Sequence, residues 1–207
     1  IGLTSKLLSK SPAISESDKL KSYVDLIGTE NLRLQAQVDK ILQMAAIESG
    51  SLILEKKKLD IHQLIEKNVS AFRAAIEEKS GTISFYPDAE NHFAMADEVH
   101  FSNVISNLID NAYKYSHDPM IISITTCNAN GKLILEVKDN GIGMDENSQR
   151  MIFDKFYRVK KGNVHDVKGF GLGLSYVKKI TELHKGTIQV ESKPGNGTTF
   201  IIQLPLQ

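Results

Sequence analysis

The stretch NVISNLIDNAYKYS, residues 103–116, carries two opposed faces on one predicted helix. Asn103, Asn107 and Asn111 stand at positions i, i+4 and i+8, so they line one side of that helix. The opposite side is apolar and carries Val104, Ile105, Leu108, Ile109 and Ala112. Asparagine is a mediocre helix former, and a solvated helix face usually carries lysine and glutamate. A stripe of neutral amides therefore indicates a binding role, with a solvated polar face as the alternative.

The residue types in this stretch suit a cation and a phosphate. The amide oxygen of asparagine is a ligand for a hard cation. Lys114 and Tyr115 follow at the end of the same helix, where they can reach a phosphate group and an aromatic base.

Further along the chain, DNGIGM at residues 139–144 follows the strand-like run LILEVK. A simple turn would explain it, because Asp-Asn-Gly is favourable turn chemistry. In the functional interpretation, Asp139 at the strand end accepts a hydrogen bond from an exocyclic amine. Gly141 and Gly143 would then let the backbone pass close to a base.

A third stretch, KGFGLGLSYVKK at residues 168–179, places three alternating glycines before a helix-like run. It is not a P-loop, which reads G-x-x-x-x-G-K-[ST]. It is not a dinucleotide fingerprint either, because the spacing differs and residues 153–168 are polar and basic rather than strand-like. Glycine-rich turns that open a helix often hold phosphate, although a flexible loop before a helix has the same pattern.

Length and composition allow one domain with an appendage. The 207 residues are 41% hydrophobic and formally uncharged overall, so bulk electrostatics does not indicate nucleic acid as a partner. The single cysteine, Cys127, excludes an intramolecular disulfide framework and suits a reducing compartment. No apolar run approaches the roughly 20 residues that span a bilayer, and no signal-like segment follows Ile1. We expect a fragment of a longer protein.

A long heptad-patterned helix is predicted near the start of the chain. After the turn-like stretch SKSPAISES, residues 9–17, apolar residues recur at spacings of four and three until Gly50. The seam positions are Leu20, Val24, Ile27, Asn31, Leu34, Val38, Ile41 and Ala45. We expect a helical hairpin, residues 1–8 with 17–49, that forms a four-helix bundle with a second copy. The alternative is a long helix packed on its own domain.

The remaining sequence predicts an α+β fold. The predicted elements are an edge strand within residues 52–61, a helix within 60–81, a strand at 82–86, a helix capped by Asp97, and two hairpins within 120–140 and 187–205. This order points to helices on one face of a mixed sheet. We divide the chain into a dimerisation hairpin, residues 1–50, and a catalytic domain, residues 51–207.

Five motifs, in order and spacing, resemble the GHKL ATP-binding domain of bacterial sensor histidine kinases. The N, G1, F and G2 boxes of that family are similar to residues 107–115, 139–143, 153–158 and 169–174. The stretch GNGTTF, residues 195–200, resembles the final glycine–threonine element of the family. Each motif alone is common, but five in order behind a coiled-coil helix are specific. The chain departs from the family at Phe170, where a small hydroxyl residue is more usual.

The resemblance implies a Bergerat-type α/β sandwich with a five-stranded mixed sheet and three helices. It also implies that ATP and Mg²⁺ bind between the N-box helix and a lid. In this interpretation Asn111 coordinates Mg²⁺, Asn107 supports the phosphate–metal unit and Lys114 contacts phosphate, so that Asn107 and Lys114 serve catalysis.

The other implied ATP-binding residues lie near the base and in the glycine-rich boxes. Tyr115 is expected against the nucleotide, and Asp139 is expected to accept the adenine amine with Thr198 in the same network. The remaining positions are Gly141, Gly143, Arg158, Lys168, Gly169, Phe170, Gly171, Leu172, Gly173 and Leu174.

The lid is expected from about Met144 to Lys168. Between residues 150 and 168 it carries six basic and two acidic residues, a balance of +4 that suits a triphosphate better than it suits a solvated loop. Phe153 and Phe156 are expected to anchor the lid on the helix layer.

The expected reaction follows from the residue at position 107. ATP-hydrolysing relatives of this fold, such as DNA gyrase, MutL and heat-shock chaperones, resemble one another in placing a glutamate one helical turn before the metal-binding asparagine. An amide cannot act as a general base near neutral pH, so Asn107 argues for transfer of the γ-phosphoryl group instead of hydrolysis.

The expected acceptor is a histidine upstream of Ile1, in the first helix of the hairpin. The six histidines of the chain are His62, His92, His100, His117, His165 and His184, and none lies within residues 1–49. The resemblance implies an ATP-dependent protein-histidine kinase of a two-component system. It further implies a homodimer whose partner is a response-regulator receiver domain, in the cytoplasmic portion of a sensor anchored in the bacterial inner membrane.

Two alternatives stay open at this point. One is an anti-sigma-type serine kinase of the same fold, which the helical hairpin argues against. The other is a non-catalytic nucleotide-binding scaffold.

Overall fold

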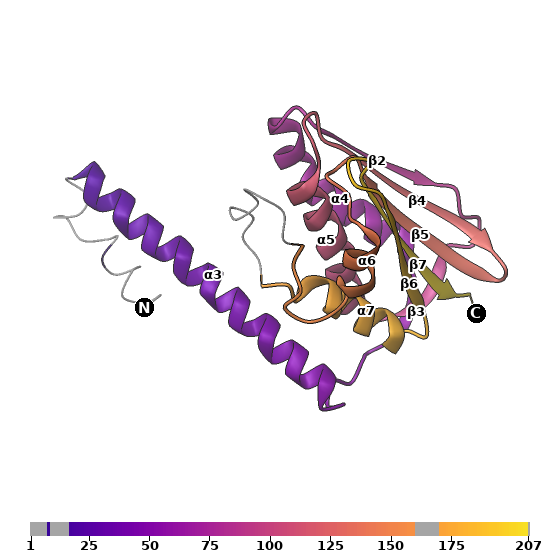
Figure 1. Cartoon of the computed structure of the whole chain (residues 1–207). Helices are drawn as coiled ribbons and strands as arrows, with labels where there is room; N and C mark the ends of the chain where they lie inside the picture. Colours follow the sequence, from indigo (N-terminus) through magenta and orange to yellow (C-terminus); the bar gives the residue numbers. More distant parts are fainter. Residues whose placement is uncertain (1–7, 9–16, 160–169, 207) are drawn as a thin grey trace. The chain divides into compact units, whose positions relative to one another are not determined.

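The computed structural model describes Leu8, residues 17–159 and residues 170–206. The chain divides into two compact units, Ile1–Leu52 and Ile53–Gln207 (Figure 1). The division falls beside the boundary predicted after Gly50, while the roles assigned to the two parts stay predictions.

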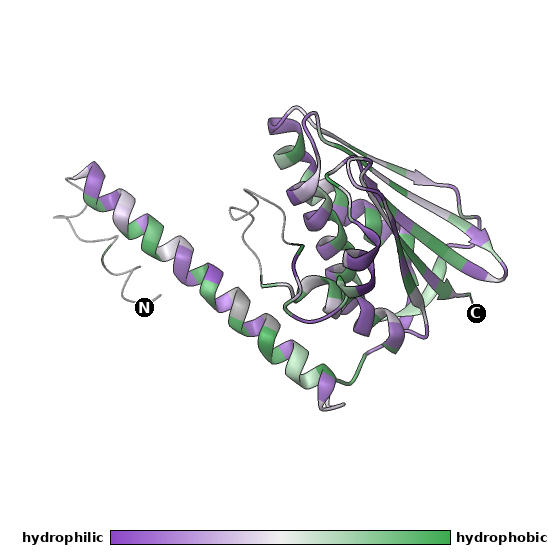
Figure 2. Ribbon diagram, viewed as in Figure 1, coloured by the Kyte–Doolittle hydropathy of each residue, from purple (hydrophilic) through white to green (hydrophobic). Residues whose placement is uncertain are grey.

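The first unit contains one long helix, α3 (Asp18–Glu48), close to the predicted range. Ser17 caps its N-terminus by accepting a hydrogen bond from the Leu20 N–H, and Gly50 follows its end with φ +68°. Hydrophobic residues recur along the helix (Figure 2). Of the heptad positions, Leu20, Ile27, Leu34, Val38 and Ile41 are exposed and Val24 is buried. The predicted first helix of the hairpin lies outside the described residues, apart from Leu8.

In the part of the chain that the structure describes, no helix has both the length and the apolar character of a membrane span.

The second unit is built on a five-stranded sheet of order β2-β4-β5-β7-β6. The strands are β2 (Thr82–Pro87), β4 (Ile121–Ala129), β5 (Lys132–Asp139), β6 (Thr187–Ser192) and β7 (Thr198–Pro205). Strands β2 and β4 are parallel, and the other pairs are antiparallel, which confirms the predicted mixed sheet. A second, antiparallel pair joins β1 (Lys57–Asp60) to β3 (Phe93–Ala96), a strand that the sequence patterns missed.

Helices α4 (Ile61–Glu78), α5 (Glu98–Tyr115) and α7 (Gly173–Leu183) cover one face of the large sheet (Figure 1). A short helix, α6 (Glu146–Met151), follows β5. The side chains between the sheet and the helices form the core, and the largest that are fully buried include Phe101, Ile105, Leu108, Ile109, Ile122, Ile124, Leu133, Leu135 and Ile180. Four of these belong to the predicted apolar face of α5 or its first turn, so the asparagine stripe points away from the sheet.

Candidate nucleotide-binding site

Asp139 is the last residue of β5 and is buried, with only 6% of its surface exposed. Its Oδ1 accepts hydrogen bonds from the backbone N–H of Gly141 at 2.8 Å and of Thr198 at 3.2 Å. Burial raises the pKa of this carboxyl group, against the two backbone hydrogen bonds, which lower it. Among the described residues, no group donates to the other oxygen, Oδ2. The carboxylate is therefore held in place by one oxygen and keeps the other for an additional donor.

The turn after Asp139 requires glycine at two positions. A Cβ on Gly141 would lie 2.1 Å from the carbonyl oxygen of Tyr115, and a Cβ on Gly143, where φ is +61°, would lie 1.9 Å from that of Lys193. The Ile142 N–H donates to the Tyr115 carbonyl oxygen at 3.0 Å. This turn is thus fixed against the C-terminal end of α5.

The β6–β7 hairpin closes over the same turn. The Gly195 N–H donates to the Ile142 oxygen at 2.8 Å, and the Gly197 N–H donates to the Gly141 oxygen at 2.9 Å. A Cβ on Gly197, where φ is +78°, would lie 1.9 Å from the carbonyl oxygen of Asp139. The structure therefore brings the turn after Asp139 together with the glycine–threonine stretch at residues 195–200, which lies more than fifty residues away in sequence.

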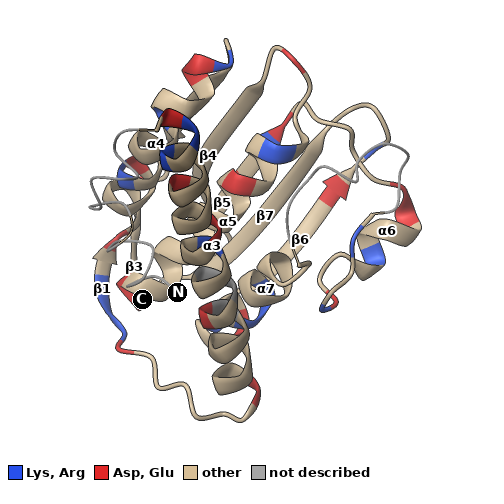
Figure 3. Ribbon diagram, turned by 90° about the vertical axis from the view of Figure 1, so that its left-hand side faces the viewer, with Lys and Arg blue, Asp and Glu red and all other residues tan. Residues whose placement is uncertain are grey.

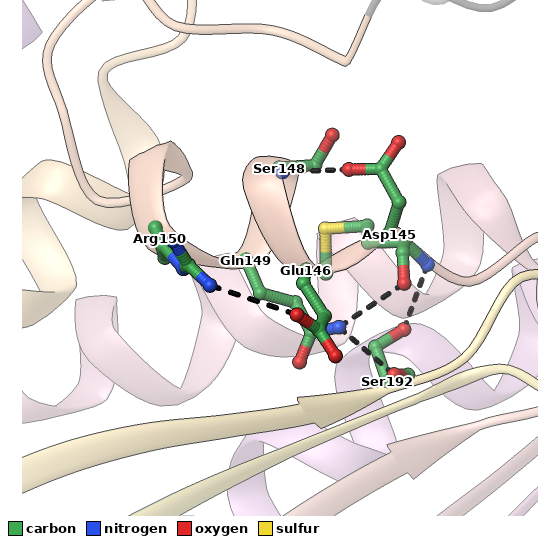
Figure 4. A network of polar contacts seen from close by, with 7 residues as sticks. Asp145, Glu146, Ser148, Gln149, Arg150 and Ser192 are labelled. Atoms are coloured by element: carbon green, nitrogen blue, oxygen red, sulfur yellow. Dashed lines mark hydrogen bonds and ion pairs between the residues drawn. The ribbon is translucent and has the colours of Figure 1, made fainter.

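Ser192 is a member of this region that the sequence analysis missed. Its Oγ accepts from the Met144 N–H and donates to the Gly197 oxygen, both at 2.8 Å, and lies 3.1 Å from Oγ1 of Thr198. The amide of Gln149 donates to the carbonyl oxygens of Met144 and Ser192 (Figure 4). These contacts tie the start of the predicted lid to β6. Ser192 carried no local signal, because its partners outside the hairpin lie more than forty residues away.

Helix α6 was also missed, although a local signal existed. Asp145 caps this helix by accepting from the Ser148 N–H at 2.7 Å, and an exposed ion pair joins Arg150 to Glu146 at 3.6 Å (Figure 4). Aspartate is among the residues preferred at a helix N-cap, and Glu146 follows it in the first turn. The sequence patterns predict this segment only as the beginning of the lid.

Asn103 and Asn107 of the asparagine stripe on α5 face α7. Asn107 Nδ2 donates to the carbonyl oxygen of Asn103 at 2.6 Å, and a Cβ on Gly173 would lie 3.0 Å from Asn107 Oδ1. The side chain of Asn111 is half-buried and makes no hydrogen bond to the described residues. Its amide oxygen therefore fits a hard cation that is otherwise held by phosphate and water oxygens.

Lys114 forms an ion pair with Asp110 one turn earlier on α5. These two residues and Glu98 are the charged residues of α5 (Figure 3). Tyr115, the last residue of the helix, is half-buried, and its carbonyl oxygen holds the turn after Asp139.

The N-terminus of α7 has no side-chain cap; its N-cap position is Leu172. Gly171 adopts φ +70°, and a Cβ there would lie 2.7 Å from the Tyr157 carbonyl oxygen. Phe170 is exposed, Leu172 is buried, and Leu174 is partly buried. Uncapped helical N–H groups form an anion-binding site in many proteins. Arg158 is exposed at the edge of the described segment, and Lys168 and Gly169 lie outside the described residues.

The prediction for the two phenylalanines was half wrong. Phe153 packs edge-on against Phe200 of β7 at 6.4 Å between ring centroids, with Lys178 Nζ 5.9 Å from its ring. Phe156 is 65% exposed and adopts φ +62°, because its N–H is directed to the Gly171 oxygen at 3.0 Å. Phe156 therefore serves the turn before α7 through its backbone, and its ring does not anchor the lid.

The mixed sheet, its three covering helices and the glycine-rich turns around Asp139 define the class of this unit as an ATPase-type α/β sandwich. The family described as "Histidine kinase-, DNA gyrase B-, and HSP90-like ATPase" matches residues 96–207. The chain belongs to this family.

Relatives within the family are sensor proteins. The chain is 44% identical over 209 aligned residues to the sensor protein RprX of Bacteroides fragilis, covering all of the chain and 40% of RprX. The structure of the histidine kinase ThkA in complex with the response regulator protein TrrA is similar with a TM-score of 0.71 and 26% identity, over 100% of the chain and 56% of ThkA. Full-length ShkA in complex with AMPPNP shares the fold, with a TM-score of 0.84 and 22% identity over 99% of the chain and 42% of ShkA. The chain thus spans less than half the length of RprX, and it groups with the sensor histidine kinases.

Proposed function

We propose that this chain is the core of a sensor histidine kinase that binds Mg-ATP and transfers the γ-phosphoryl group to a histidine on a segment preceding Ile1. The observation that carries this proposal is that the site has two separate features. The buried carboxylate of Asp139 has hydrogen bonds to only one of its oxygens, and the residue at the phosphate side is an amide, Asn107. The first group suits adenine, and the second argues against water activation.

Adenine recognition would rest on Asp139. Its Oδ2 can accept the exocyclic amine, while Oδ1 stays held by Gly141 and Thr198. The ring of Tyr115 would lie against the nucleotide, and the close backbone turn at Gly143 would leave room for the flat base. An acceptor-only group in a buried site discriminates strongly, because a base without a donor would leave it unpaired.

Phosphate binding would rest on the facing ends of α5 and α7. The uncapped N-terminus of α7, with Gly171, Leu172, Gly173 and Leu174, would donate N–H groups to phosphate oxygens. Lys114 would give up its ion pair with Asp110 and form an ion pair with a phosphate group instead. Arg158 and Lys168 would add positive charge from the lid.

The divalent cation, when bound, supplies positive charge that stabilises the transferring phosphoryl group. Asn111 would hold it through the amide oxygen. Asn107 would orient the phosphates without accepting a proton, since its Nδ2 is engaged by Asn103 and an amide does not titrate in this range. The nucleophile would have to attack without a general base at position 107, and a neutral histidine imidazole can do so because its attacking nitrogen carries a lone pair and no proton.

The partners follow from the same proposal. The exposed heptad positions of α3 would pair two copies of the chain, and each phosphohistidine would pass its phosphoryl group to a response-regulator aspartate. ThkA, a relative of this chain, has been solved with a response regulator. The parent protein would be a sensor anchored in the inner membrane, with this chain in the cytoplasm.

The test is phosphoryl transfer from γ-labelled ATP in the parent protein, with the segment before Ile1 included. We expect an acid-labile, base-stable label that is lost in Asn111→Ala and retained in the matched Asn128→Ala, whose amide lies on β4 and pairs with Asn91. Label on serine of a separate protein would favour the anti-sigma alternative. Binding without any transfer would favour a scaffold, and rapid steady ATP hydrolysis would contradict the assignment of Asn107.

A further inference from the structure

A line of polar side chains runs along the contact between α5 and α7, beyond the residues assigned to the nucleotide. Helix α5 contributes His100, Asn103 and Asn107, spaced by three and four residues, so they share one face. The facing stripe consists of Gly173, Tyr176 and Ile180 of α7 and of His184, the residue that follows the helix. Gly173 meets Asn107 while His184 meets the start of α5, so the two helices run antiparallel. We call the polar members of these stripes, together with Asp97, the α5–α7 polar seam.

One end of the seam lies where α5 begins and α7 ends. His184 Nδ1 donates to the Ile180 oxygen at 2.7 Å, so its Nε2 accepts from the Asp97 N–H at 2.9 Å. The Asp97 carboxylate caps α5 through the His100 N–H at 3.0 Å and also accepts the Glu55 N–H at 2.8 Å. This end therefore joins α5, α7 and the chain that enters the unit.

The middle of the seam is the phenol of Tyr176, a residue only 7% exposed. Its oxygen lies 2.8 Å from His100 Nδ1. Burial raises the pKa of this phenol, and a hydrogen bond with the Asn103 side chain opposes part of that rise. The neutral hydroxyl thus bridges two side chains of α5 that are three residues apart.

The other end of the seam is the proposed phosphate side. Asn103 contributes its backbone oxygen to Asn107 Nδ2, and Asn107 Oδ1 sits against Gly173, the first residue of α7. Directional hydrogen bonds between buried and half-buried groups select one arrangement, because a slide of one turn would leave the polar atoms of Asp97, Tyr176 and His184 unpaired in the interior. Apolar packing alone tolerates such shifts more readily.

We propose that the α5–α7 polar seam, through Tyr176 and His100, is a positioning element that fixes the N-terminus of α7 opposite Asn107 for phosphate binding. The inference rests on the proposed function, since it assigns the phosphates to that gap. Tyr176 and His100 would be positioning residues that touch no part of the nucleotide. They would act on affinity for the phosphates and leave the base site at Asp139 unaffected.

The test compares ATP and adenosine affinity by calorimetry in variants of the full chain. Tyr176→Phe keeps the buried ring and removes the hydroxyl, and His100→Leu removes the imidazole nitrogen that this hydroxyl contacts. Each should weaken ATP binding by roughly fivefold to tenfold, as expected for one lost hydrogen bond, and change adenosine binding by less than about twofold. His100→Asn should restore most of the ATP affinity, because the asparagine oxygen can occupy the place of Nδ1. The double variant should lose no more than either single variant.

Tyr113→Phe is the matched control, because Tyr113 also lies on α5 and its ring contacts Lys79 without a hydrogen bond from its hydroxyl to the described residues. It should bind both ligands as the wild type does. Equal losses of ATP and adenosine, a loss of ATP affinity below about twofold, or additive losses in the double variant would overturn the positioning role. Failure of the wild-type chain to bind ATP would instead overturn the proposed function, and the role of the seam with it.

Discussion

The two ends of the candidate site are built differently. At the carboxylate end, which we define as Asp139 with residues 139–143 and 193–198, backbone hydrogen bonds and glycines fix every segment. At the helix end, defined as the C-terminal half of α5 with the N-terminus of α7, the groups that would meet phosphate are engaged locally or lack a side-chain partner. Lys114 pairs with Asp110, and α7 starts without a side-chain cap.

This difference indicates that the two ends of the site have different roles in ligand binding. A preformed base site loses little conformational entropy on binding and selects the ligand by its hydrogen-bond pattern. At the phosphate site the α5–α7 polar seam holds the two helices in place, and only local contacts such as the Lys114–Asp110 ion pair are exchanged for ligand contacts when the ligand arrives. We therefore expect substitutions at the carboxylate end to lower the free energy of unfolding and substitutions at the helix end to change ligand affinity.

The largest effect is expected from Gly197→Ala, which breaks the carboxylate end. The new Cβ would lie 1.9 Å from the Asp139 carbonyl oxygen, so the hairpin must move. We expect the free energy of unfolding to fall by more than about 3 kcal/mol in urea denaturation. Gly195→Ala is the control, since φ is +80° there and nothing lies within 4 Å of its Cβ. It should lose only about 1 kcal/mol from the left-handed backbone, and equal losses would refute the steric argument.

Asp139→Asn separates binding from stability at the same end. We expect ATP affinity to fall by about tenfold to a hundredfold, because the amide presents a donor toward the adenine amine. The fold should not be weakened at pH 7. Burial raises the pKa of Asp139 in the folded chain. The carboxyl group therefore adds to the free energy of unfolding at pH values below its pKa in the unfolded chain, and this contribution is lost as pH rises through the folded pKa. Calorimetry with unchanged ATP affinity would remove Asp139 from the base site.

Lys114→Met probes the helix end. Its ion pair with Asp110 is partly exposed, so the free energy of unfolding should fall by at most about 0.5 kcal/mol. ATP affinity should fall by about tenfold while adenosine affinity stays the same. Lys67→Met, on the exposed face of α4, should change neither ligand. A loss shared by adenosine would place Lys114 outside the phosphate contacts.

The smallest effect concerns pH and His184. Burial lowers the pKa of His184, with Lys56 and His100 acting in the same direction while the Ile180 oxygen and Asp97 oppose. The unfolded chain therefore binds protons more readily, so stability is full above the ordinary histidine pKa and falls as pH drops below it. Urea denaturation measured between pH 7 and pH 5 should show that the free energy of unfolding depends less steeply on pH in His184→Asn than in the wild type. The pKa of His62 is also lowered, mainly by burial, so His62 contributes to the same pH dependence. The pH series should therefore be measured in His62→Asn as well.

The sequence predicted the elements that have local signals. The apolar and amide faces of α5, its Asp97 cap, the Asn-Gly hairpin and the long α3 are confirmed, because each follows from spacing or from one capping residue. Strand β3 was missed because its four residues are all apolar and too few to show the alternating pattern of a strand. The exposure of Phe156 could not be predicted, since it depends on a backbone bond to Gly171.

The candidate site was predicted as a set of residues, without its connections. The stripe of asparagines was found from helical spacing, but its contact with Gly173 and the roles of Tyr176 and Ser192 depend on the pairing of segments far apart in sequence. Such pairings leave no local pattern, because each partner is unremarkable in its own segment.

The most direct test of the difference between the two ends is amide hydrogen exchange with and without Mg²⁺ and a non-hydrolysable ATP analogue. We predict that residues 139–143 and 193–198 are already protected in the free chain and change little. The amides of residues 173–175, which precede the first intrahelical hydrogen bond of α7 from Tyr176 to Leu172, should exchange readily when free and become protected on binding. Protection that appears only with nucleotide at the carboxylate end, or an α7 start that is equally protected in both states, would contradict the account.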